Sequence, residues 1–188
     1  MQQHLIHQQV QKLGNALIYL ASNVGELSKT KILKLLFLLD ESSVKRFGYP
    51  FFGLSFQIWK LGLVLKEVYI DLSEDSPNLL RDFIERAPYD NKIYIAKGAF
   101  NDDQFSDNDI YLLEKIKHFA RHKTAKDLIN YTHEDNSLWR KSAIKNVILH
   151  QRESAEVNST EFEIDFSLLF DSDEELRDAT LNHWKTLT

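Results

Sequence analysis

The amino-acid sequence predicts a mainly α, multi-helical domain with a small antiparallel β element. Three observations support this fold class. Only three Pro and six Gly interrupt the 188 residues, which favours long helices over many short strands. Apolar residues recur at three- and four-residue steps near the start of the chain, as they do on one face of a helix. Residues 92–97 are rich in β-favouring side chains and end at Gly98, so we expect a short strand there.

The first two predicted helices have the strongest periodic signal. The first covers residues 10–24 and ends near Gly25. Ser28 is the predicted N-cap of the second helix, and Gly48 is the residue that ends it. The apolar residues of this second helix cover most of its circumference: Ile32, Leu33, Leu35, Leu36, Phe37, Leu38 and Leu39. Such a helix is usually central, so we expect other elements to pack on several of its sides.

The middle of the chain alternates turns with short elements. Residues 49–53 form a predicted turn, and residues 54–59 are expected to be extended. A helix is expected over residues 63–72. The Ser-Pro dipeptide that follows is typical of an N-cap and a first helical residue, which predicts a further helix over residues 76–86.

Three hydroxyl residues are predicted N-caps of the later helices. Ser106 precedes a helix that extends to about His122, and the acidic first turn of this helix suits the positive end of the helix dipole. Thr124 and Asp127 have the spacing of a capping box. Ser137 is the predicted cap of a third, short helix.

The C-terminal part of the chain is acidic. Residues 153–188 contain ten acids and two bases, a charge of −8, so the rest of the chain sums to +3. Alternating apolar residues predict a half-buried strand over residues 162–168, and a helix is expected over residues 172–187. We therefore divide the chain into a domain over residues 1–150 and an acidic strand–helix extension over residues 151–188 that packs on it.

Composition narrows the possible function classes. The sequence has no Cys, which excludes disulfides, thiolate nucleophiles and Cys-based zinc sites. Its start lacks the pattern of a signal peptide, and its apolar run over residues 35–39 is far shorter than the ~20 residues that span a bilayer. We predict a cytoplasmic protein without membrane contact. The net charge of −5 argues against nucleic acid as a partner, although it leaves a local basic patch open.

Few residues suggest catalytic or metal chemistry. His118 and His122 are four residues apart on one helix face, a spacing that can bind zinc, but no third ligand is identifiable. The sequence His133-Glu134-Asp135 concentrates titratable groups at a helix end. Because no nucleophile, phosphate loop or cofactor fingerprint accompanies either group, capping and solvent exposure are the better interpretations.

The segment QIWKLGLVLKEVY at residues 57–69 poses the main structural question. Its apolar half is expected to close the core beneath the central helix: Ile58, Leu61, Val64, Leu65 and Val68. Trp59 and Trp139 are core or interface anchors, with the core favoured because most large apolar side chains are buried. The row of Lys29, Lys31 and Lys34 is interpreted as a solvated helix face, with contact to nucleic acid as the alternative.

Three blocks of sequence follow one another in a characteristic order. They are TKILKLLFLLDESSVKRFGYPFFG, FQIWKLGLVLKEVY and FSDNDIYLLEKIKHFARHKTAKDLINYTHEDNSLWRKS. Together they resemble the Panacea domain, or SocA-like antitoxin family, over residues 27–143. That family has a Lys-Leu-Leu-Tyr/Phe core helix, a glycine turn, an aromatic strand and a Gly-Pro-Val helix start. It closes with the features found here as Thr124, Ala125, Leu128, His133 and Trp139.

The chain departs from the family pattern at one corner. Where the family usually has His-Gly-Pro-Val, this chain has Leu-Gly-Leu-Val at residues 61–64. The missing Pro predicts a less sharply defined helix start. If partners dock at this corner, their specificity differs from the family norm.

The resemblance implies binding and not catalysis. It implies an antitoxin, associated with bacterial or phage toxin–antitoxin pairs, that neutralises a cognate toxin protein by direct contact. An adaptor that delivers the toxin to a cellular protease is a related role. No cofactor, metal ligand or catalytic residue is expected. The candidate partner-binding residues are Trp59, Lys60, Gly62, Lys66, Tyr69, His133 and Trp139.

Two alternatives from other function classes stay open. A metal-assisted hydrolase would use His118, His122 and His133 as ligands or acid–base groups. A DNA-binding regulator would use residues 124–139, which have the rhythm of a helix–turn–helix, although the net charge argues against it.

Overall fold

A computed structural model describes residues 5–59, 62–146 and 160–170, and shows a mainly α fold with two small antiparallel sheets. The helices are α1 (His7–Asn23), α2 (Lys29–Phe47), α3 (Lys66–Asp71), α4 (Asp107–Ala120), α5 (Ala125–Thr132), α6 (Leu138–Lys145) and the 3-10 helix η1 (Phe166–Phe170). The strands are β1 (Leu27–Ser28), β2 (Gln57–Trp59), β3 (Gly62–Val64), β4 (Ile84–Ala87) and β5 (Asp90–Ala96). Because these strands are present, the fold is mainly α but not all-α.

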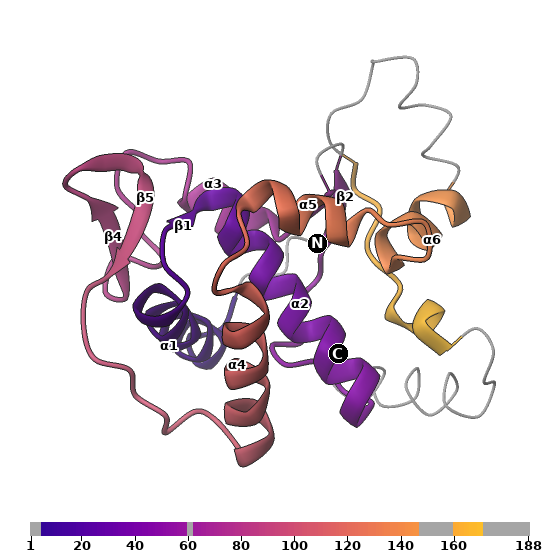
Figure 1. The fold of residues 1–188 in the computed structure, drawn as a ribbon, viewed down its shortest axis with the longest axis horizontal. Coiled ribbons are helices and arrows are strands. Elements are labelled where there is room, and N and C mark those ends of the chain that lie inside the picture. The colour runs from indigo at the N-terminus through magenta and orange to yellow at the C-terminus, as the bar shows by residue number, and fades with distance from the viewer. Residues whose placement is uncertain (1–4, 60–61, 147–159, 171–188) are drawn as a thin grey trace.

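Helix α2 is the central element, as its all-round apolar pattern predicted. It contacts α3, α4, α5, β1, β3, β5 and η1, and in Figure 1 it runs between the β4–β5 hairpin and α6. The Ser28 side chain accepts a hydrogen bond from the Lys31 N–H and so caps the helix. Gly48 ends it with a left-handed φ of 79°, which a residue without a Cβ adopts at little cost.

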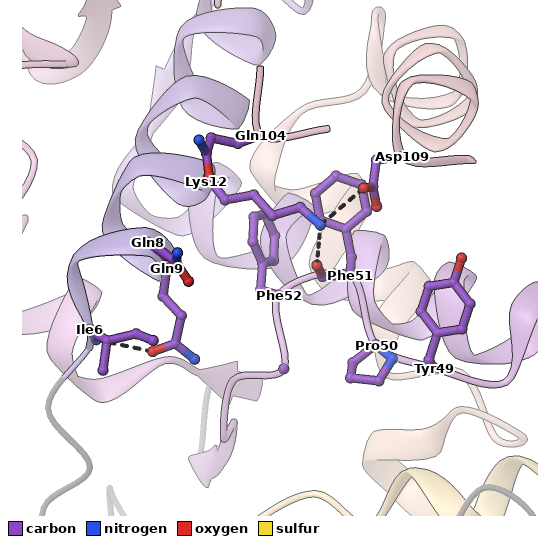
Figure 2. A pocket seen from close by; sticks show the side chains of 11 residues that line it. Ile6, Gln8, Gln9, Lys12, Tyr49, Pro50, Phe51, Phe52, Gln104 and Asp109 are labelled. Carbon is purple, nitrogen blue, oxygen red and sulfur yellow. Dashed lines mark hydrogen bonds and ion pairs between the residues drawn. The ribbon is translucent and has the colours of Figure 1, made fainter. Parts of the chain in front are cut away.

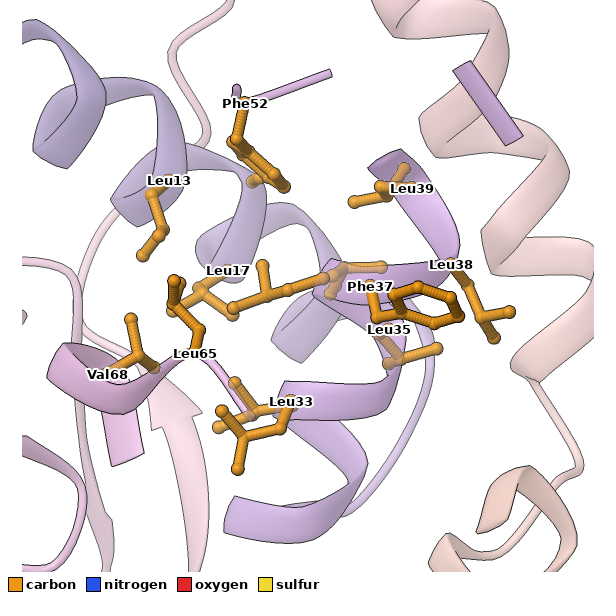
Figure 3. Close-up of a cluster of buried hydrophobic side chains, with 14 of the residues drawn as sticks. Leu13, Leu17, Leu33, Leu35, Phe37, Leu38, Leu39, Phe52, Leu65 and Val68 are labelled. Carbon is orange, nitrogen blue, oxygen red and sulfur yellow. The ribbon is translucent and has the colours of Figure 1, made fainter. Parts of the chain in front are cut away.

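The hydrophobic core forms where other elements meet α2. Figure 3 shows Leu13 and Leu17 of α1 beside the side chains of α2, with Leu65 and Val68 approaching from the start of α3. Every described member of the predicted apolar half of residues 57–69 is buried: Ile58, Val64, Leu65 and Val68. Leu61 lies outside the described residues.

The larger sheet has the strand order β1–β5–β4, and all its pairs are antiparallel. The strand predicted over residues 92–97 is confirmed as β5, but it starts earlier and has two partners. α1 contacts β4 and β5, so the sheet and the first helix share one side of the core.

The helix predicted over residues 76–86 is wrong. The Asp71 carboxylate accepts hydrogen bonds from the N–H groups of Asn78, Leu79 and Leu80, at 2.7, 2.7 and 3.1 Å. These bonds hold the segment in turns, and residues 84–87 pair with β5 instead. The hydrogen bonds to a carboxylate of the preceding helix therefore outweigh the local helix preference of the Ser-Pro dipeptide.

The helix predicted over residues 63–72 starts too early. Its first residues belong to β3, and the helix itself is α3, Lys66–Asp71. The strand forms because Gly62–Val64 pairs with Gln57–Trp59, so the aromatic segment and the glycine corner make a hairpin.

None of the described helices is long and apolar enough to cross a membrane.

The predicted N-caps of the later helices are confirmed. The side chains of Ser106, Thr124 and Ser137 each accept the predicted N-cap hydrogen bond from a backbone N–H three residues on. Both Ser106 and Thr124 are part of complete capping boxes.

The strand predicted over residues 162–168 is only partly present. One antiparallel bridge joins Gln57 to Glu163, and the chain then enters η1 at Phe166. The Phe166 ring stacks on Phe37 of α2, with centroids 6.0 Å apart. The helix predicted over residues 172–187 lies outside the described residues.

Candidate functional site

The candidate site is built around the β2–β3 hairpin. Its register pairs Gln57 with Val64 and Trp59 with Gly62. The two residues that join the strands, Lys60 among them, lie outside the described residues. The hairpin thus brings an aromatic side chain and a glycine, predicted as separate candidates, to directly opposite positions.

Four residues from distant parts of the chain meet at the turn end of the hairpin, where Gly62 lies. We call Lys34, Gly62, His133 and Trp139 the hairpin cluster. Gly62 has a φ of +109°, and a Cβ built on it would lie 2.7 Å from His133 Nε2 and still closer to Lys34 Nζ. The His133 ring stacks on Trp139, with centroids 4.1 Å apart and planes inclined by 22°. Only glycine leaves room for the amine and the imidazole at this point.

Lys34 is the most deeply buried charged member of this cluster. Its side chain is only 2% exposed, and Nζ donates a hydrogen bond to the Leu63 carbonyl at 3.3 Å. Burial lowers the pKa of the Lys34 amine to about 8. Because a buried amine needs polar partners, the hydrogen bond ties β3 directly to α2.

Three of the predicted residues form the rim of the hairpin. We call Trp59, Lys66 and Tyr69 the hairpin surface. The Trp59 and Tyr69 rings meet edge to face, with centroids 4.9 Å apart. Lys29 Nζ lies 4.2 Å from the centre of the Tyr69 ring, and Lys66 Nζ lies 3.3 Å from Glu161 Oε1. All three rim side chains stay partly exposed, so they are accessible to a partner.

A C-terminal segment lies along the second edge of β2. The Ile58 N–H donates to the Phe162 carbonyl at 2.9 Å, and the Ile164 N–H donates to the Phe56 carbonyl at 2.8 Å. The Thr160 hydroxyl donates to the Ile58 carbonyl at 2.7 Å. Residues 160–164 therefore cover this edge and bring Glu161 to the hairpin surface.

A family model for the Antitoxin SocA-like, Panacea domain matches residues 32–140. The chain belongs to this family. Comparison with curated proteins and with solved structures gave no match. The matched range contains every residue of the hairpin cluster and the hairpin surface. The Panacea domain supports an antitoxin role for the chain, and with it a toxin as partner in general.

The predicted site residues separate into two groups in the Panacea domain. Gly62 and Trp139 are buried, and half-buried His133 joins them at the turn end of the hairpin. The second group is the hairpin surface. The interpretation of Trp139 as core is consistent with its burial, whereas Trp59 is only partly covered.

Sequence reasoning missed the role of Lys34. The row Lys29, Lys31 and Lys34 was interpreted as a solvated face, and this is wrong for two of its members, since Lys31 and Lys34 are buried. A signal was available, because Lys34 lies within the helix segment that is apolar nearly all round. A lysine inside such a segment must be buried on some side.

The three histidines of the hydrolase alternative have different surroundings. His118 and His122 are exposed, and His118 Nε2 lies 3.8 Å from a Glu114 carboxylate oxygen, whereas His133 is stacked on Trp139. Among the residues that the structure describes, no group of three or more His, Asp or Glu is arranged to hold a metal ion.

A pocket of about 430 Å³ lies between α1, the turn after α2 and the start of α4 (Figure 2). Lys12 crosses it and donates to the Phe51 carbonyl at 2.8 Å and to Asp109 Oδ2 at 3.1 Å. The N–H of Phe52, which lines the pocket, donates a hydrogen bond of 2.7 Å to the fully buried Asp40. None of the predicted site residues lines this pocket, and its central amine is already paired with protein groups.

Proposed function

We propose that the chain is an antitoxin that neutralises a cognate toxin by direct protein–protein contact through the hairpin surface. Membership of the antitoxin family supports the general role. The observation that carries the finer proposal is the convergence of Lys34, Gly62 and His133 beneath the hairpin. Three sequence blocks that resemble the family thus contribute to one small structure.

The hairpin cluster gives the hairpin surface a fixed shape before binding. A surface that is already ordered loses less conformational entropy on association than a mobile loop does. The two aromatic residues of the hairpin surface are Trp59 and Tyr69. Trp and Tyr are enriched among the interface residues that dominate binding energy. A contact of about 800 Å² per partner, centred on these rings, would suffice for a stable complex.

Growth rescue tests this proposal. The gene adjacent to this one is expressed alone and with the antitoxin gene. We expect growth arrest in the first case and restored growth in the second, while the antitoxin alone is harmless. If no neighbouring gene is toxic, the antitoxin role is contradicted.

Variants of the hairpin surface test the proposed contact. Trp59→Ala combined with Tyr69→Ala is expected to abolish rescue and to weaken toxin binding at least tenfold, as the loss of two central aromatic anchors would. Lys66→Glu is a second variant that leaves both rings in place. The matched control is Tyr89→Ala, because Tyr89 is 69% exposed and is not part of the hairpin surface. Unchanged rescue by the folded hairpin variants contradicts this surface.

Toxin abundance distinguishes occlusion from delivery to a protease. Occlusion predicts that the toxin level stays constant when the antitoxin is co-expressed. Degradation through an adaptor predicts that the toxin disappears unless the protease is removed. An immunoblot of the toxin over time gives the answer.

A further inference from the structure

A strongly basic stretch joins the end of α4 to the start of α5. Residues 115–126, KIKHFARHKTAK, contain five Lys or Arg residues, two His residues and no acid. The whole chain, by contrast, has a net charge of −5. Because physiological salt screens charges beyond about 8 Å, a ligand at this stretch responds to the local charge and not to distant acids. The stretch is therefore a local positive surface on an acidic protein.

Helix geometry turns this stretch toward solvent. α4 contacts α1 and α2, and its buried face carries Leu112, Ile116 and Ala120. The basic residues occupy other positions of α4 and of the turn that joins it to α5. Figure 1 shows the course of this part of the chain. We call the exposed group the basic surface: Lys115, His118, Arg121, His122 and Lys126.

Few carboxylates offset the charge of the basic surface. Glu114 precedes the stretch and forms an ion pair with Lys117, and its carboxylate also lies 3.8 Å from Nε2 of His118. Asp127 follows the stretch in the first turn of α5. Within the part of the chain that the structure describes, no salt bridge involves Lys115, Arg121 or Lys126. These three cations are available to an external anion.

Two aromatic rings lie beside these cations. The Phe119 and Tyr131 rings are 4.9 Å apart between centroids, with planes inclined by 57°. Lys123 Nζ lies 4.8 Å from the centre of the Phe119 ring, so the aromatic pair is continuous with the basic stretch. Tyr131 is 40% exposed and offers part of a ring to solvent. Basic groups that accompany an exposed ring are the combination found in proteins that bind single strands.

We propose that the basic surface binds single-stranded nucleic acid, with phosphates on its cations and a base stacked on Tyr131. An aromatic ring serves an unpaired base, whose face is accessible, and not a duplex, whose bases stack on one another. An acidic protein as the ligand would account for the cations but not for the exposed Tyr131 ring. None of these residues belongs to the hairpin surface, so the proposal is independent of the antitoxin role.

Fluorescence anisotropy of the full-length chain tests the proposal. The probe is labelled oligouridylate of about 20 nucleotides, long enough for several protein contacts on one strand. We expect binding that weakens steeply between about 50 and 200 mM salt, since phosphate contacts release counterions. Oligothymidylate of the same length shows whether the sugar matters. A duplex of the same length is expected to bind at least tenfold more weakly.

A charge-matched pair of variants locates the binding. The test variant is Lys115→Gln, Arg121→Gln and Lys126→Gln together, all at exposed positions, so we expect it to fold. Losing three phosphate contacts should reduce the slope of log affinity against log salt by about 2, at about 0.7 per contact for single strands. The control changes the net charge by the same amount at three exposed residues elsewhere: Arg81, Lys92 and Lys97. We expect the control to bind as the wild type does.

The aromatic contribution has its own control. Tyr131→Ala is expected to weaken binding about tenfold, because one stacked base is lost. Tyr89→Ala removes an exposed ring far along the sequence and should leave affinity unchanged. Three results would overturn the proposal: no binding at low salt, equal weakening by the test and control variants, or complete competition by polyglutamate at matched charge. The last result would identify an acidic protein as the ligand class.

Discussion

Buried polar side chains hold the backbone in place around the hairpin and the turn after α2. Lys34 donates to a carbonyl of β3, and Asp40 accepts from a backbone N–H of the turn. Gly62 leaves the space that the Lys34 amine needs. Such groups cost free energy to bury, and each one is offset here by a hydrogen bond that also fixes the neighbouring segment.

Substitution of Gly62 tests the packing of the hairpin cluster. Gly62→Ala is expected to lower the free energy of unfolding by about 2–4 kcal/mol, because the left-handed backbone is strained and the new methyl group clashes with buried atoms. Gly48→Ala is the matched control. Gly48 also has a positive φ of 79°, but nothing lies within 4 Å of its added Cβ. Gly48→Ala should lower the free energy of unfolding, measured with urea, by only about 1 kcal/mol. Equal losses for the two variants would contradict the packing role.

The buried carboxyl group of Asp40 predicts a dependence of stability on pH. Burial raises the pKa of Asp40 from 3.8 to about 7. Between these values the folded state keeps a proton that the unfolded state releases, so the free energy of unfolding falls as pH rises. Asp40→Asn keeps an acceptor for the Phe52 N–H and removes the titration.

Urea unfolding of both proteins at pH 5 and pH 7 measures this effect. Relative to Asp40→Asn, the wild type should lose about 1 kcal/mol or more per pH unit over this interval. Identical pH dependence in the two proteins would show that Asp40 titrates in the folded state as it does in the unfolded state.

At the scale of elements, a side chain of α3 determines the conformation of the segment that follows it. The Asp71 carboxylate caps three successive N–H groups of residues 78–80. Arg86 contacts the residues just before these, since its guanidinium donates to the carbonyls of Leu72, Glu74 and Asp75. Together these contacts replace the predicted helix by a loop and a strand.

Asp71→Asn tests the capping of this loop. The amide offers one carbonyl oxygen and no charge, so charge-assisted hydrogen bonds to the loop are lost, which should cost about 1–3 kcal/mol in the free energy of unfolding. Asp82→Asn is the control, because the Asp82 side chain is 80% exposed, and it should change stability by less than about 0.5 kcal/mol. If Asp71→Asn also lowers the free energy of unfolding by less than about 0.5 kcal/mol, other contacts hold the loop.

At the scale of the whole molecule, the far end of the described chain returns to the core. Residues 160–164 extend along β2, and Phe166 stacks on α2. Lys145 Nζ and Asp165 Oδ2 lie 2.7 Å apart and join α6 to the same segment. These contacts predict that the segment unfolds together with the domain.

Two phenylalanines in this segment test that prediction. Phe166 is buried and Phe162 is 48% exposed, so the pair differs mainly in what each ring contacts. Phe166→Ala should lower the free energy of unfolding by about 3–5 kcal/mol, the usual cost of removing a buried aromatic ring, in one cooperative transition. Phe162→Ala should cost less than about 1 kcal/mol. A separate early transition at residues 160–170 would contradict common unfolding.

The sequence by itself determined what depends on neighbouring residues. The caps at Ser28, Ser106, Thr124 and Ser137, the stop at Gly48 and the central burial of α2 all follow from contacts within a few positions or from helical periodicity. The family resemblance also follows from the order of the sequence blocks.

Only the tertiary structure decided what depends on residues far apart. The convergence of Lys34, Gly62 and His133, the loop held by Asp71 and the contact of residues 160–164 with β2 join groups separated by up to about a hundred positions along the chain. Local propensity cannot anticipate such contacts, because their free energy appears only when the packed elements bring the partners together.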